Sequence, residues 1–154
     1  MVSNLNLGPF MSHFSPEDLD LNQQYIVTFN GVDVPVEIEP ETNDGAQQQR
    51  EALSALLSLP PDVLEEAAPA VVQNYEVYRE AIGDEELPPL QTPADVWKSV
   101  EPSKFLIPAH DIYPIPTFFL MAECDWDPEH GLAVRFRNGR ADAASQQGEL
   151  DLED

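Results

Sequence analysis

Four side chains capable of acid–base or metal chemistry stand within six consecutive positions near the end of the chain: Asp125, Asp127, Glu129 and His130. Carboxylate oxygens and imidazole nitrogens are ligands that divalent cations accept in proteins. The spacing of a calcium-binding loop is absent, and no second histidine stands four positions from His130. A turn in which His130 bonds a carboxylate or a carbonyl is therefore the competing interpretation, and the sequence assigns no metal ligand.

Cys124 comes directly before this cluster and is the only cysteine of the chain. With His130 as base and Asp127 as the group that orients it, Cys124 would be a nucleophile. Its place on the apolar side of an alternating strand pattern favours burial, which raises the pKa of a thiol and hides its sulfur. We therefore interpret Cys124 as a small core residue, with no catalytic residue and no cofactor assigned. His13 and His110 lie in proline-flanked segments that no pattern joins to this cluster.

A second set of carboxylates covers the solvent side and the end of a predicted helix: Glu65, Glu66, Glu76, Glu80, Asp84, Glu85 and Glu86. Paired acids hydrolyse glycosides only at a defined separation, which a sequence does not supply. A charge run of this kind is usually a solvated face. The functional alternative is complementarity to a basic surface, as an inhibitor of a cationic nuclease or toxin would have. Besides the four residues of the turn, the candidate binding residues are Glu76, Glu80, Asp84, Glu85 and Glu86.

Charge limits the partners of this chain. Seven basic against 29 acidic side chains give its 154 residues a formal charge of −22. Nucleic acids and anionic membranes require a basic footprint, so neither is an expected partner. The imbalance favours a basic protein partner, a salt-adapted source or simple solubility.

Compartment and domain count follow from the same sequence. One cysteine cannot form an internal disulfide, which fits a reducing compartment. No apolar run approaches the roughly 20 residues of a membrane span, and the N-terminus lacks the features of a signal peptide. We expect a cytoplasmic bacterial protein with one domain over residues 21–140, preceded by an arm at 1–20 and followed by an acidic, flexible tail at 141–154.

The candidate turn joins two predicted strands in a hairpin over residues 117–138. Apolar residues alternate along both strands, and the segment from Asp127 to Gly131 has the Asp, Pro and Gly of a short turn. Matching the apolar faces predicts a register in which Arg135 lies opposite Glu123. The same register pairs Trp126 with Leu132, Cys124 with Val134, and Ala122 with Phe136.

This hairpin carries an extended motif. It is Glu-Cys-Asp-Trp-Asp-Pro-Glu-His-Gly-Leu at residues 123–132, followed by Val134, Arg135 and Phe136 and by Asn138-Gly139. The motif resembles the C-terminal signature of a family of small bacterial domains of unknown function, in which an acidic Trp-(Asp/Glu)-x-Glu-His-Gly turn joins two strands. The resemblance implies a shape and no established reaction, substrate or cofactor.

The remaining elements are read from local signals. Asn30-Gly31 between two apolar runs predicts a hairpin over residues 25–38, and Pro35 places its second strand at a sheet edge. Apolar periodicity predicts helices over 46–57 and from Pro61 to Ile82. A capping box beginning at Thr92 predicts a short third helix, and residues 105–107 read as a strand.

Together these elements predict an α+β fold, in which an antiparallel sheet of two or more hairpins carries two longer helices and one short helix on one face. The function we expect is a non-enzymatic acidic protein-binding module, immunity-like, whose target is a basic protein. One alternative is a metal-dependent or other hydrolase centred on the turn from Asp125 to His130. The other is a structural or oligomerisation domain that exposes a sheet edge.

Overall fold

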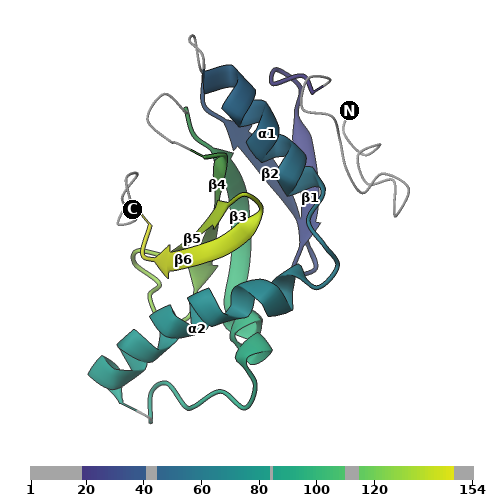
Figure 1. Cartoon of the computed structure of the whole chain (residues 1–154). Helices are drawn as coiled ribbons and strands as arrows, with labels where there is room; N and C mark the ends of the chain where they lie inside the picture. Colours follow the sequence, from purple (N-terminus) through teal and green to yellow (C-terminus); the bar gives the residue numbers. More distant parts are fainter. Residues whose placement is uncertain (1–18, 41–44, 84, 110–114, 148–154) are drawn as a thin grey trace.

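The computed structural model describes residues 19–40, 45–83, 85–109 and 115–147, which form helices packed on a twisted sheet (Figure 1). Its strands follow one another in chain order across the sheet, from β1 at one edge to β6 at the other. The elements are β1 Tyr25–Phe29, β2 Val32–Ile38, α1 Gly45–Leu57, α2 Val63–Ile82, the 3₁₀ helix η4 Pro93–Ser99, β3 Val100–Ile107, β4 Thr117–Cys124, β5 Leu132–Arg137 and β6 Arg140–Ser145. The predicted α+β class is confirmed.

The β1–β2 hairpin has the predicted register. Asn30 and Gly31 take φ values of 54° and 76°, as a two-residue hairpin turn requires. The paired residues are Phe29 with Val32, Val27 with Val34, and Tyr25 with Val36. β2 is nevertheless an internal strand, because β3 pairs with it from Val36 onward, directly after Pro35.

The sheet is mixed, which corrects the expectation of an antiparallel sheet. β2 and β3 run parallel, with Val36 opposite Phe105 and Ile38 opposite Ile107. Parallel neighbours need a long crossover, and here α1, α2 and η4 provide it. β3 is also longer than the predicted strand at 105–107. The pairing of β2 with β3 joins residues far apart in sequence, and a local sequence pattern does not predict such a pairing.

The predicted register of β4 and β5 is wrong. Ala122 pairs with Leu132 instead of Phe136, and Arg135 lies opposite Phe119 instead of Glu123. The other observed pairs on the apolar face are Leu120 with Val134 and Phe118 with Phe136. β4 ends at Cys124, so the connection is longer than a short turn and Trp126 lies outside the ladder. The displacement is an even number of residues, so each strand keeps its apolar face on the core.

Residues 140–145 form β6, which corrects the expectation that a flexible tail begins at residue 141. Asn138 and Gly139 take φ values of 52° and 81° and close the β5–β6 hairpin as Asn30-Gly31 closes the first. Residues 1–18 of the expected arm, and the remainder of the expected tail from residue 148, lie outside the described residues.

The core lies between the sheet and the helices. Phe118 stacks on Phe136 with ring centroids 4.8 Å apart, and Phe105 meets Phe118 edge to face. Such pairs contribute about 0.5–1.5 kcal/mol each beyond their area burial. Leu53 of α1 and Val71 of α2 belong to the same buried cluster. Both helices therefore cover one face of the sheet, as predicted.

The third helix begins as its capping box predicts. The Thr92 N–H donates to Asp95 Oδ2 at 3.1 Å, and Val96 and Trp97 are buried. Trp97 Nε1 donates to the carbonyl of Leu64 at 2.7 Å, which ties η4 to α2. Among the helices that the structure describes, none is long and apolar enough to cross a membrane.

Candidate functional site

The turn from Asp125 to His130 is built around the carboxylate of Asp127, which is 7% exposed. Its Oδ2 accepts a hydrogen bond from the Tyr78 hydroxyl of α2 at 2.6 Å. Its Oδ1 accepts the backbone N–H of His130 at 3.1 Å and lies at the same distance from His130 Nδ1. Asp127 therefore closes its own turn and fastens that turn to α2.

Trp126 makes the second attachment of this turn to α2. Its Nε1 donates to Asn74 Oδ1 at 2.8 Å, and its ring meets Tyr75 edge to face at 5.1 Å. Tyr75 in turn donates its hydroxyl to the carbonyl of Pro88 at 2.6 Å. Asn74, Tyr75 and Tyr78 lie within one helical turn of each other, so a single stretch of α2 receives the whole connection.

The Asp127 environment stabilises the charged carboxylate. Burial by itself raises the pKa of Asp127, but hydrogen bonds from the Tyr78 hydroxyl and from the His130 N–H outweigh it. The pKa of Asp127 is therefore lowered from its ordinary value. The lowered pKa favours the charged form of Asp127, which is the form that accepts these hydrogen bonds.

Cys124 is a core residue, as expected. It is 4% exposed, and burial raises the pKa of its thiol to about 11. Its Sγ lies 3.9 Å from the carbonyl oxygen of Asp127. At neutral pH the group is a protonated thiol, which is a poor nucleophile.

The four candidate residues of the turn do not converge on one point. Asp127 and His130 are in contact, whereas Asp125 and Glu129 are exposed, and among the described residues no hydrogen bond or ion pair joins them to either side chain. The side chain of His130 is itself 52% exposed. Across the described ranges, no group of three or more His, Cys, Asp or Glu side chains is placed to hold a metal ion. The metal interpretation of this turn therefore gains no support from the geometry.

The helix carboxylates divide into engaged and open ones. Glu76 pairs with Arg79 at 2.7 Å, and Glu66 pairs with Arg140 of β6 at 3.2 Å. Glu80, Glu85 and Glu86 are exposed, and no ion pair to them is found among the described residues. Asp84 lies outside those residues. Three open carboxylates thus lie at the C-terminal end of α2 or just beyond it, and a fourth, Glu65, is exposed in the first turn of the helix.

Most of the cationic side chains of this protein are already neutralised. Six of the seven Lys and Arg residues form ion pairs within the chain. Arg135, 6% exposed, and Arg137 share the carboxylate of Asp142, each at 2.9 Å. The large acidic excess is therefore not balanced by free cations on the described surface.

Two hollows contain residues that the sequence analysis did not single out. One, of about 610 Å³, is lined by Glu101, Glu123 and Asp125 among others. Glu101 and Glu123 lie directly opposite each other on β3 and β4, a pairing that only the register reveals. Like charges in such a pair repel.

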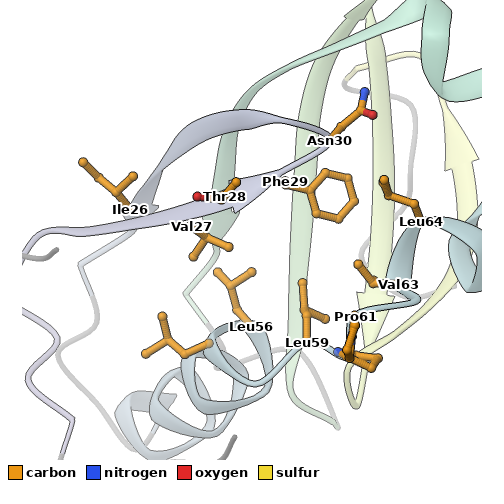
Figure 2. A pocket seen from close by; sticks show the side chains of 12 residues that line it. Ile26, Val27, Thr28, Phe29, Asn30, Leu56, Leu59, Pro61, Val63 and Leu64 are labelled. Atoms are coloured by element: carbon orange, nitrogen blue, oxygen red, sulfur yellow. The ribbon is translucent and has the colours of Figure 1, made fainter. Parts of the chain in front are cut away.

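The other hollow is a groove of about 280 Å³ between β1 and the connection from α1 to α2 (Figure 2). It is lined by Ile26, Val27, Thr28, Phe29, Asn30, Leu56, Leu57, Leu59, Pro60, Pro61, Val63 and Leu64. In sequence these segments show only the apolar patterns of a strand and two helix ends, and their meeting is a tertiary property.

Neither a curated protein nor a solved structure matches this chain significantly. A family described as a domain of unknown function matches it over residues 11–151. The match includes the hairpin that suggested a family of uncharacterised domains, and nearly all of the chain before it. On that evidence of near-complete coverage, the chain belongs to the DUF6985 family of domains of unknown function.

Proposed function

We propose that this domain is a non-enzymatic binding module that recognises a basic protein through Glu80, Glu85 and Glu86. The observation that carries the proposal is the ion pairing of six of the seven cationic residues within the chain. A chain of formal charge −22 has then almost no free cations to screen its carboxylates. A basic surface would supply the missing counter-charge and would be steered toward it.

The end of α2 is an unfavourable place for these carboxylates in the isolated chain. A helix C-terminus carries partial negative charge, so acidic side chains there raise the local negative potential. Arg79 is the basic residue of the last turn, and Glu76 and the carbonyl of Leu87 already engage it. A cationic partner would relieve this repulsion, which favours this end of α2 over other acidic positions.

The test compares two triple variants of equal charge. Glu80→Gln, Glu85→Gln and Glu86→Gln neutralise the proposed surface, whereas Glu101→Gln, Glu123→Gln and Glu129→Gln neutralise three exposed carboxylates elsewhere. The probe is a basic protein retained from the source lysate at low salt, identified by mass spectrometry and then purified. Its affinity for each variant is measured by calorimetry at about 50 and 300 mM NaCl.

We expect the first variant to bind about tenfold more weakly at low salt and to lose most of its salt dependence. The matched variant should bind nearly as the parent does. Equal losses in both variants would show that net charge alone drives binding, and this would overturn the assigned surface. A partner whose affinity ignores salt would overturn the proposed function itself.

A hydrolase centred on the turn is the second candidate. The observation that favours it is the contact between Asp127 and the half-exposed ring of His130, since a carboxylate can orient an imidazole for proton transfer. Tyr78 already occupies the other oxygen of Asp127, and the Cys124 thiol is protonated. Turnover of ester, phosphoester or peptide substrates that His130→Ala abolishes, in a variant that melts like the parent, would establish this alternative.

A further inference from the structure

The groove beside β1 has a wall made of backbone. Five consecutive residues, from Ile26 to Asn30, line it, and consecutive residues of a strand can share one hollow only along the strand edge. Figure 2 shows Val27 and Phe29 directed toward Leu56 and Val63 on the opposite wall. The groove therefore has an apolar floor and a polar main-chain rim.

That rim has hydrogen-bonding groups to offer. Among the strands that the structure describes, β1 is terminal in the sheet and β2 is its one neighbour. In a two-residue hairpin the closing pair, Phe29 and Val32, exchanges hydrogen bonds. By alternation, the N–H and C=O groups of Ile26 and Thr28 point away from β2. Among the described residues, no backbone hydrogen bond outside the β1–β2 ladder uses these groups.

The β1 strand itself carries neither of two residue types that commonly prevent strand addition. Its sequence, Tyr-Ile-Val-Thr-Phe, contains neither a charged residue nor a proline. The side chain of Ile26 is 45% exposed, which makes it one of three large apolar residues exposed in the described part of the chain. An open apolar edge beside an apolar groove is the arrangement that strand-adding peptide sites share.

Charge near the groove indicates what kind of strand would fit. The groove shares Asn30, Pro61 and Leu64 with an adjoining hollow that Asp62 and Glu65 also line. Both carboxylates are exposed. Lys98, which shares this hollow, is engaged by Asp95 at 3.3 Å. A side chain that extends past the apolar floor would therefore meet negative charge.

We propose that β1 and this groove bind an extended segment of a partner protein, in which apolar residues alternate and a Lys or Arg follows. The segment pairs its backbone with Ile26 and Thr28, places its apolar side chains over the groove, and directs its cation to Asp62 and Glu65. A second copy of this chain is disfavoured as occupant, since two surfaces of high negative charge repel. The cationic part of this inference rests on the proposed function, whereas the strand pairing stands on the groove alone.

The test uses a labelled peptide of about eight residues in which Val alternates with Thr and two Lys follow. Amide chemical shifts and hydrogen exchange of the full chain locate its binding. We expect the Ile26 and Thr28 amides to shift and to become protected when the peptide is added. Protection of both amides in the free chain would show that the edge is already occupied, and this would overturn the proposal.

Thr28→Pro removes one outward N–H, and Thr28→Val is its matched control. Both substitutions delete the hydrogen bond from the Thr28 hydroxyl to Asp33 Oδ1, but Val keeps the backbone donor. We expect Thr28→Pro to weaken peptide binding about tenfold and Thr28→Val to leave it nearly unchanged. Equal affinities for the two variants would overturn strand pairing.

Two further peptides keep the test decisive if Thr28→Pro fails to fold. A peptide N-methylated at alternate residues cannot complete the ladder and should lose binding to the parent chain; undiminished binding would contradict strand pairing. A peptide ending in two Glu should bind more weakly. If it binds at β1 as tightly as the Lys peptide, the site is a strand site without charge selection, and the cationic part of this inference fails while the strand pairing stands.

The groove proposal can also fail while the proposed function stands. If the Lys peptide shifts the amides around Glu80 and Glu86 and leaves Ile26 and Thr28 unchanged, the acidic binding function stands and the groove proposal fails. A dimer of the chain alone, seen by sedimentation and abolished by Thr28→Pro, would make a second copy the occupant and overturn the heterologous partner.

Discussion

The two edge strands of the sheet, β1 and β6, each belong to a hairpin with an Asn-Gly turn. They differ in charge, in what packs against them and in the regularity of their pairing. β1 is uncharged, ends at a groove and leaves Ile26 half exposed. β6 carries Arg140 and Asp142, packs against α2, and contains an extra residue where its register with β5 shifts. Charge, a bulge and a covering helix are three devices that prevent strand addition. The contrast indicates that β6 resists the addition of a further strand, whereas β1 is the edge at which we propose that a partner segment binds.

The largest effect that would sharpen this contrast is expected from Phe29→Ala in β1. Phe29 is 3% exposed and meets both Trp97 and Phe105 edge to face. Removing its ring should lower the free energy of unfolding by about 3–5 kcal/mol, measured by urea denaturation. A loss below about 1 kcal/mol would mean that β1 is not anchored in the core as the rings imply.

Asp142→Ala tests whether β6 depends on charge for its attachment. It removes the carboxylate with which Arg135 and Arg137 both form ion pairs, and it leaves the buried guanidinium of Arg135 without that partner. We expect a loss of about 1–2 kcal/mol, with faster hydrogen exchange in β6 than in β1. Arg140→Gln, at an ion pair whose Arg is 77% exposed, is the control and should cost less than about 0.5 kcal/mol. Equal effects would contradict the role of Asp142.

Gly31→Ala and Gly139→Ala compare the two turns directly. The glycines have φ values of 76° and 81°, and a methyl group would meet nothing closer than 3.6 Å at either position. Each substitution should therefore cost only the backbone strain, about 1 kcal/mol, with similar shifts in thermal midpoint. A much larger effect at one glycine would show that the turns are not equivalent.

Acid should loosen the β6 side of the sheet before the β1 side. The folded-state pKa of Asp127 lies below its unfolded value, so its stabilising effect is complete above the unfolded pKa and disappears as the pH falls through the folded one. Gln147 follows β6 and donates its backbone N–H to the His130 carbonyl, which joins that strand to the turn. Hydrogen exchange at decreasing pH should show β6 opening first. In Tyr78→Phe, which lacks one donor to Asp127, this acid response should shrink.

Short sequence patterns predicted the features that depend on a few neighbouring residues, namely a hairpin turn and the beginning of a helix. Asn30-Gly31 fixed one hairpin, and the capping box at Thr92 fixed the beginning of η4. Asn138-Gly139 is the same signal and predicts the β5–β6 hairpin equally well, so β6 could have been found. The small and polar composition of residues 140–145 predicts a flexible tail instead, because composition does not show that β5 and α2 contact this segment.

The candidate site was predictable only in part. Asp127 and His130 were named together and are in contact, but the partner that holds Asp127, Tyr78, belongs to α2 and is 49 residues away. Alternation predicts that Trp126 is a strand residue, yet it lies outside the ladder, where it bonds Asn74 and packs against Tyr75, and the register of β4 and β5 differs from the predicted one. Contacts of this kind arise from packing between elements, which a one-dimensional pattern does not contain.

The parallel pairing of β2 with β3 has a consequence for the order in which the protein is made. A ribosome releases the β1–β2 hairpin first, and its two-residue turn lets it form at once. The three helices α1, α2 and η4 must then be synthesised before β3 can join β2. During that interval the nascent hairpin has two open edges, and an early partner or a chaperone would meet it in that state.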